Sequence, residues 1–167
     1  MALATATPDG RPSVRIVLLK GIDDDGIRFY TNYDSRKGRE LAANPRAAAT
    51  LYWQPLQRAV RLEGPVERLT GEESDAYFAT RSRGSQLGAW ASPQSQEVSS
   101  RAELDEMYRG IEQRFAASDD VPLPPQWGGF RVRPDLVEFW QGRVGRMHDR
   151  LVYRRAGEGW VTSRLAP

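Results

Sequence analysis

The chain has 167 residues, of which 40% are hydrophobic and 28% charged, an ordinary balance for a globular protein. With no cysteine and one histidine, neither a disulfide framework nor a metal site is expected. Its 24 basic residues are interleaved with 22 acidic ones, so we expect no nucleic-acid partner. Lacking a long apolar run or a signal peptide, the sequence predicts a single cytoplasmic domain over residues 1–167, with no membrane partner.

The first part of the chain predicts an antiparallel meander. Alternating and β-branched residues favour strands over residues 2–7, 13–20 and 27–31, with turns at 8–12 and 23–26. Residues 35–43 then predict a short helix, which carries Arg36 and Lys37 in its first turn. Acidic residues are usually favoured there, so an external anion such as phosphate is a candidate ligand, and two solvated cations are the alternative.

A candidate phosphate site follows the next two strands, which we expect over residues 46–53 and 57–68 with a bend at Gly64. The capping-box pattern from Thr70 predicts a helix, and Tyr77, Arg81 and Ser85 recur along it at four-residue spacing. They would share one face if the helix continued that far. A phenol, a guanidinium and a hydroxyl suit a phosphate ester, whereas an unrelated tyrosine–arginine contact also fits the pattern.

The remainder of the chain predicts a loop, a helix and several strands. Residues 86–95 are typical of a loop, and a second capping box at Ser100 opens a helix whose apolar stripe, from Leu104 to Phe115, predicts core packing. Strands are expected over residues 130–141, with an interruption at Pro134, and over 150–155 and 160–165. About seven or eight strands with three helices, joined mainly by antiparallel connections, indicate a small barrel decorated by helices.

The only histidine, His148, lies between Arg146 and Arg150. If this segment is extended, the period of two places all three side chains on one face. Their mutual repulsion would be relieved by an anion or an electron-rich ring. A structural role for His148 is the alternative.

Several separated stretches carry a resemblance to a known family. They are Arg15-Ile16-Val17-Leu18-Leu19-Lys20; Tyr30-Thr31 with Ser35-Arg36-Lys37; Gln86 to Trp90 with Gln94-Ser95; Trp127 to Val132; Trp140 to Arg150; and Arg164-Leu165-Ala166-Pro167. In this order they resemble the pyridoxamine/pyridoxine 5′-phosphate oxidase family. The resemblance implies a mainly β fold with flanking helices (α+β), namely an antiparallel Greek-key split β-barrel that binds flavin mononucleotide (FMN) at a homodimer interface. It also implies oxidation of pyridoxamine or pyridoxine 5′-phosphate to pyridoxal 5′-phosphate in vitamin B6 metabolism, with O2 reduced to H2O2.

The same resemblance implies roles for individual residues. The residues implied to contact FMN are Arg15, Ile16, Val17, Leu18, Leu19, Lys20, Tyr30, Thr31, Arg36, Lys37, Gln94, Ser95, Trp140 and Arg150. Those implied to bind substrate are Lys20, Tyr77, Arg81, Ser85, Arg146, Met147 and His148, with Arg146 and His148 as the catalytic pair against the substrate ring.

Two departures from the family pattern bear on function. Ala59 stands where the family usually has glutamine, so a contact to the flavin is expected to be missing. The chain also begins at the first barrel strand, without the segment that usually precedes it and partly closes over the substrate. The alternatives are a related flavin oxidase for another aromatic substrate, as in phenazine biosynthesis, and a non-catalytic module that binds FMN or pyridoxal phosphate.

Overall fold

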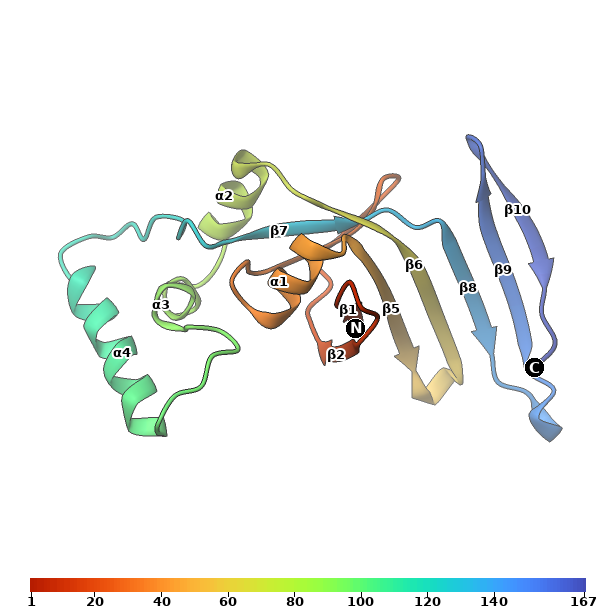
Figure 1. Ribbon diagram of the computed structural model, residues 1–167, viewed down its shortest axis with the longest axis horizontal. Coiled ribbons are helices and arrows are strands. Elements are labelled where there is room, and N and C mark those ends of the chain that lie inside the picture. Colours follow the sequence, from red (N-terminus) through yellow and green to blue (C-terminus); the bar gives the residue numbers. More distant parts are fainter. The chain divides into compact units, whose positions relative to one another are not determined.

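The computed structural model describes residues 1–167 and has ten strands, four α-helices and two short 3-10 helices. The strands are β1 (Ala2–Ala6), β2 (Pro12–Ile16), β3 (Gly21–Asp23), β4 (Gly26–Asn32), β5 (Arg46–Trp53), β6 (Arg58–Arg68), β7 (Trp127–Val132), β8 (Leu136–Gln141), β9 (Asp149–Ala156) and β10 (Gly159–Arg164). The helices are α1 (Arg36–Ala43), α2 (Gly71–Ala79), α3 (Arg83–Ala91) and α4 (Arg101–Arg114) (Figure 1). Both totals exceed the predicted ones, because β3 and α3 were not anticipated and because β7 and β8 are separate strands where one interrupted strand was expected.

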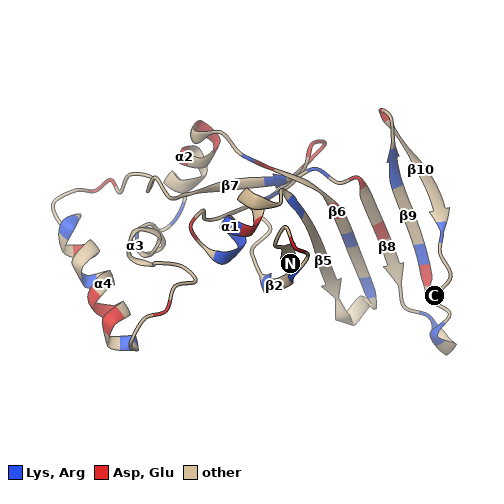
Figure 2. Ribbon diagram, viewed as in Figure 1, with Lys and Arg blue, Asp and Glu red and all other residues tan.

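The chain divides into two compact units. The first comprises residues 1–29, 40–67 and 131–167, and the second comprises residues 30–39 and 68–130. In the first unit the strands follow the order β10-β9-β8-β6-β5-β1-β2, and successive pairs are antiparallel. The predicted class, a mainly antiparallel β fold with flanking helices, is therefore confirmed. Basic and acidic positions are interspersed along the strands and along α4 (Figure 2).

The core of the first unit follows from alternation along its strands. Leu3 of β1, Leu62 of β6 and Val152 of β9 are buried, while their neighbours in sequence are more exposed. The partner of β6 changes at Gly64. Residues up to Glu63 pair with β8, whereas Pro65 O accepts a hydrogen bond from the N–H of Arg133. A Cβ on Gly64 would lie 2.0 Å from Arg133 O, so this approach of two backbones requires glycine.

The second unit packs α2, α3 and α4 around an aromatic core. Phe78 of α2, Leu87 of α3, Phe115 after α4 and Trp127 of β7 are buried together, and Tyr108, from the predicted stripe of α4, packs against them. No helix in the described chain is both long and apolar enough to span a bilayer.

Two predictions fail in the second unit. Helix α2 ends at Ala79, because the hydroxyl and the N–H of Thr80 both donate to Tyr77 O and close the last turn. Tyr77, Arg81 and Ser85 therefore do not share one helix face. Residues 86–91 belong to α3 rather than to a loop, since Ser82 begins a new helix that buries Leu87.

Two predicted extended segments are also shorter than expected. Strand β2 ends at Ile16, so residues 17–20 lie outside regular structure. Residues 144–146 form a 3-10 turn in which Gly145 has φ +68° and Arg146 has φ +63°, and β9 begins only at Asp149. Because this turn interrupts the extended conformation, Arg146, His148 and Arg150 do not lie in line on one strand face.

Candidate cofactor and substrate sites

In the second unit, Lys37 collects residues from distant parts of the sequence. Its Nζ donates to Thr31 Oγ1 at 2.9 Å, Gln94 Oε1 at 2.7 Å and Ser35 Oγ at 3.3 Å. The Thr31 hydroxyl in turn donates to Gln94 Oε1 at 2.9 Å. Three predicted cofactor residues thus meet around one ammonium group whose residue is only 8% exposed. These three acceptors are uncharged oxygens, and an ammonium group beside them suits an anion.

The start of α1 supports this arrangement. The Ser35 hydroxyl accepts from the N–H of Gly38 at 3.2 Å and so caps the helix, which carries no acidic residue in its first turn. Arg36 is exposed in that turn. The start of α1 therefore carries two cations at the positive end of the helix, and an anion bound there stays a prediction.

Arg81 lies in an aromatic environment in the same unit. Its guanidinium carbon lies 4.6 Å from the centre of the Trp127 ring and 5.4 Å from that of Phe78. Tyr77 stacks on Tyr30, with ring centres 3.8 Å apart. Burial lowers the pKa of Arg81, an effect that the neighbouring Tyr77 partly opposes. Tyr77 and Arg81 are therefore neighbours even though they do not share a helix.

The Nη1 of Arg81 is buried and has no hydrogen-bond partner in the protein. Leaving such a charged donor without an acceptor costs at least about 1–3 kcal/mol, so the group suits an anionic ligand. The third member of the predicted set, Ser85, lies in the first turn of α3, where its hydroxyl is 2.9 Å from that of Ser82. It makes no hydrogen bond to Arg81 in the structure.

In the first unit, His148 lies beside Trp140, with ring centres 4.8 Å apart. Its Nδ1 accepts from the N–H of Arg143 at 3.2 Å, which assigns the proton of the neutral ring to Nε2. Next to it, Asp149 accepts from Arg143 at 2.9 Å and from Arg164, and the hydrogen bond from Arg143 is the main cause that lowers the pKa of Asp149. The ring of Trp140 and the N–H of Arg143 orient the imidazole. Arg146 and Met147 are exposed beside it.

Arg150 is engaged within the sheet. Its Nε and Nη2 bind the two carboxylate oxygens of Glu138 at 2.8 and 2.9 Å, and its Nη1 donates to Ala166 O at 3.2 Å. The hydrogen bond from Arg150 is the main cause that lowers the pKa of Glu138, and Arg61 lowers the same pKa further. Glu138 was not predicted as a site residue, although an acidic residue among the apolar residues of β8 indicates a buried ion pair.

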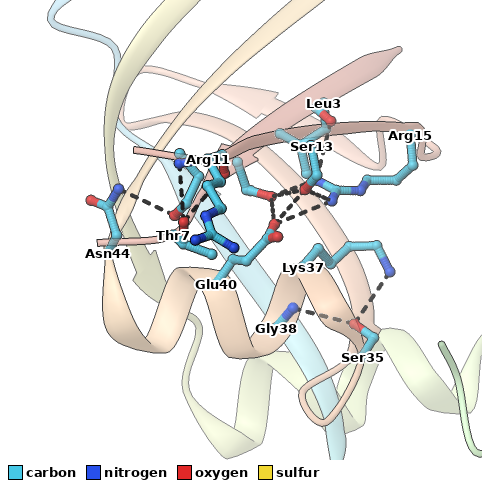
Figure 3. Close-up of polar contacts among 12 residues, drawn as sticks. Leu3, Thr7, Arg11, Ser13, Arg15, Ser35, Lys37, Gly38, Glu40 and Asn44 are labelled. Carbon is cyan, nitrogen blue, oxygen red and sulfur yellow. Dashed lines mark hydrogen bonds and ion pairs between the residues drawn. The ribbon is translucent and has the colours of Figure 1, made fainter. Parts of the chain in front are cut away.

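The predicted N-terminal cofactor segment, residues 15–20, follows β2. The side chain of Arg15 makes hydrogen bonds to β1, β2 and α1 (Figure 3). Ile16 and Leu18 are exposed, Val17 donates its N–H to Met1 O, and Lys20 donates its N–H to Arg28 O. Leu19 is half-buried.

Backbone strain coincides with two predicted site residues. Only Gln57, Ser95 and Arg146 have positive φ among the non-glycine residues, at 50°, 69° and 63°. Such conformations cost free energy and concentrate at functional sites.

Ala59, where a glutamine was expected, pairs with Trp140 and lines a cavity of about 570 Å³ in the first unit.

Comparisons with known proteins identify the family. A family model described as pyridoxamine 5′-phosphate oxidase matches residues 1–114, and one described as the pyridoxine 5′-phosphate oxidase C-terminal dimerisation region matches residues 127–167. The pyridoxine/pyridoxamine 5′-phosphate oxidase of Rubrobacter xylanophilus is 61% identical over 167 residues, covering all of this chain and 76% of that protein. Its counterpart in Salinibacter ruber is 58% identical over 170 residues and is covered to 79%.

Solved structures agree with these matches. PhzG from Burkholderia lata 383, crystallised with tetrahydrophenazine-1-carboxylic acid, has a TM-score of 0.92 at 37% identity, over 99% of this chain and 81% of that chain. A pyridoxamine 5′-phosphate oxidase-related, FMN-binding protein from Nostoc punctiforme has a TM-score of 0.78 at 20% identity, over 99% and 87% of the two chains. The second likeness concerns the fold alone and agrees with the predicted split barrel. From the two family models and the identity to its relatives, the chain belongs to the pyridoxamine 5′-phosphate oxidase family.

Proposed function

We propose that this protein is an FMN-dependent oxidase that converts pyridoxamine or pyridoxine 5′-phosphate to pyridoxal 5′-phosphate, with O2 reduced to H2O2. The observation that carries the proposal is the buried, unpartnered Nη1 of Arg81 beside Tyr77. A phosphate ester would supply a negatively charged acceptor for this donor, which an uncharged substrate would not. The names of the relatives at 58–61% identity support the same substrate class.

The donor set around Lys37 fits the phosphate of FMN. Bound FMN would supply the hydride acceptor for the substrate and the reductant for O2. The residues that we assign to holding it are those the family resemblance implies: residues 15–20, Tyr30, Thr31, Arg36, Lys37, Gln94, Ser95, Trp140 and Arg150. Among them, the Lys37 cluster supports the assignment because it is buried, positively charged and already ordered by Thr31 and Gln94.

His148 and Arg146 are assigned to the substrate ring. Removal of a hydride from C4′ must be balanced by loss of a proton from the attached oxygen or nitrogen. With the alcohol this gives the aldehyde directly, and with the amine it gives an imine that water hydrolyses to the aldehyde and ammonia. Because Nδ1 of His148 is occupied by the N–H of Arg143, Nε2 is the nitrogen that can exchange a proton with the substrate. Arg146 would orient the ring, and the phosphate held by Tyr77, Arg81, Ser85 and Lys20 would supply binding energy for that orientation.

We further propose that the protein acts as a homodimer. The match of residues 127–167 to a dimerisation region supports this, and exposed apolar side chains such as Val144 and Met147 lie in that part of the chain. Sedimentation of the purified protein tests the proposal: a mass of twice the chain's 18.8 kDa is expected, and a monomer at micromolar concentration would contradict it.

A second candidate is oxidation of a phenazine precursor, favoured by the TM-score of 0.92 to PhzG. Peroxide release separates the two functions. The test compares pyridoxine 5′-phosphate, pyridoxamine 5′-phosphate, unphosphorylated pyridoxine and tetrahydrophenazine-1-carboxylic acid as substrates. We expect peroxide with the two phosphate esters. Turnover of the phenazine acid with neither ester oxidised would favour the second candidate, and no peroxide with any substrate would favour a non-catalytic binding protein.

A further inference from the structure

A buried carboxylate on α1 organises the residues around Arg15. Glu40 is 5% exposed, and its Oε2 accepts from the hydroxyls of Ser13, at 2.5 Å, and Thr5. The same oxygen lies 3.3 Å from Nη2 of Arg15 (Figure 3). Glutamate is almost never buried unless it is paired, so this carboxylate is held in place by Arg15 and the two hydroxyls.

The contacts of Arg15 leave one edge of its guanidinium for a ligand. Nη1 donates to Thr5 Oγ1 at 2.5 Å and to Leu3 O at 3.3 Å, while Nη2 donates to Ser13 Oγ and to Glu40. A guanidinium has five N–H groups, two on Nη1, two on Nη2 and one on Nε. The four acceptors therefore take up the four N–H groups of Nη1 and Nη2. The Nε–H makes no hydrogen bond within the protein and is the donor that remains.

We propose that Glu40 is a positioning residue for Arg15, which it holds so that the Nε–H and the positive charge are presented to FMN. This inference rests on the proposed function, because Arg15 is one of the residues assigned to FMN. The carboxylate binds Arg15 directly and also orients the two hydroxyls that accept from Arg15. Through these three contacts Glu40 restricts the guanidinium to one orientation before the cofactor binds.

The expected effect is on affinity. A free arginine side chain samples many rotamers, and ordering it during binding weakens the complex. With Glu40 present, that ordering is completed when the protein folds. Removing the carboxylate releases Arg15 and leaves the buried hydroxyl of Thr5 with a poorer set of partners, so FMN would bind to a disordered donor.

The test measures the FMN dissociation constant of the apoprotein from the quenching of flavin fluorescence. Glu40→Ala should weaken FMN binding about tenfold. Glu40→Gln should stay within about threefold of the unaltered protein, since its amide oxygen can still accept from Arg15. In a protein that already carries Arg15→Ala, Glu40→Ala should leave the FMN dissociation constant almost unchanged, because the effect of Glu40 is transmitted through Arg15.

A matched control separates positioning from general destabilisation. Val66→Ala removes core volume from β6 in the same unit without touching this cluster. It should lower the melting temperature and leave FMN affinity unchanged. If Val66→Ala weakens FMN as much as Glu40→Ala does at equal loss of melting temperature, the inference is wrong.

The outcomes also distinguish this inference from the proposed function. If the unaltered protein binds FMN and Glu40→Ala binds it equally well, or if the effects of Arg15→Ala and Glu40→Ala simply add, the positioning role is overturned and the oxidase proposal stands. If the unaltered protein binds no FMN, both are overturned.

Discussion

The guanidinium carbon of Arg81 lies 4.6 Å from the centre of the Trp127 ring, while Nη1 of the same group is buried without an acceptor. The aromatic face stabilises the cation, and the unpartnered N–H remains available to a ligand. The pair therefore forms a preformed receptor for one anionic group. No sequence pattern linked these two residues, which are far apart in the chain.

Replacement of Arg81 should affect the phosphate of the substrate. Arg81→Leu should raise KM for pyridoxine 5′-phosphate about ten- to a hundredfold, the equivalent of one charge-assisted hydrogen bond. The preference over unphosphorylated pyridoxine should shrink by a similar factor, as steady-state peroxide assays would measure. Arg101→Ala, which removes an exposed arginine of α4, is the control and should leave both values unchanged. An unchanged preference in Arg81→Leu would contradict the phosphate assignment.

His148 should affect turnover and not cofactor binding. His148→Ala should lower kcat about a hundredfold, the usual contribution of a positioned acid–base group, while the protein retains its flavin absorbance. His148→Asn, whose side-chain oxygen can still accept from the N–H of Arg143, tests whether the ring is needed for its proton. It should be as slow as the alanine variant. Full activity in either variant would show that His148 is structural.

Lys37 should control FMN affinity. Lys37→Met keeps the length of the side chain and removes its charge, so Thr31 and Gln94 lose their shared donor. We expect the FMN dissociation constant to rise about ten- to a hundredfold. Arg39→Ala, on the exposed face of the same helix, is the matched control. Equal affinities in the two variants would show that the charge of Lys37 does not hold the cofactor.

The Glu138–Arg150 pair should make stability depend on pH in acid. Because the hydrogen bond from Arg150 lowers the pKa of Glu138 in the folded state, the pair contributes stability above the unfolded pKa of Glu138 and loses it as pH falls through the lowered value. Glu138→Gln should cost about 2 kcal/mol at pH 7. In a chain of this size that corresponds to a fall in Tm of about 4–8 °C. The difference in Tm between the two proteins should shrink as pH falls through the lowered pKa of Glu138, and a constant difference across pH would contradict the prediction.

Strands and capped helices could be predicted well because their signals are local. The Thr70 capping box, the turn before Gly26 and the helix start at Arg36 each depend on a few adjacent residues, and the structure has all three. The break after Ala79 could not be predicted in this way. There the helical spacing of Tyr77 and Arg81 suggested continuity, and a hydroxyl-to-backbone bond from Thr80 ended the helix instead.

The family resemblance implied the candidate site residues, and the structure brings some of them into contact. Thr31, Lys37 and Gln94 meet although Gln94 is distant in sequence, which no spacing rule predicts. Glu40 and Trp127 were missed as site residues because their importance arises from three-dimensional contacts. A glutamate on a short helix and a tryptophan before two glycines have no local signature of buried hydrogen bonding or of cation binding.

The most direct test of the central claim is the visible spectrum of the purified protein, with FMN bound, as pyridoxine 5′-phosphate is added in the absence of oxygen. The proposed function predicts a yellow protein whose flavin band bleaches on addition and returns when oxygen is admitted with release of peroxide. Unphosphorylated pyridoxine at the same concentration should bleach it far less. A yellow protein that pyridoxine and pyridoxamine 5′-phosphate both fail to bleach, or one that FMN does not bind, would contradict the claim.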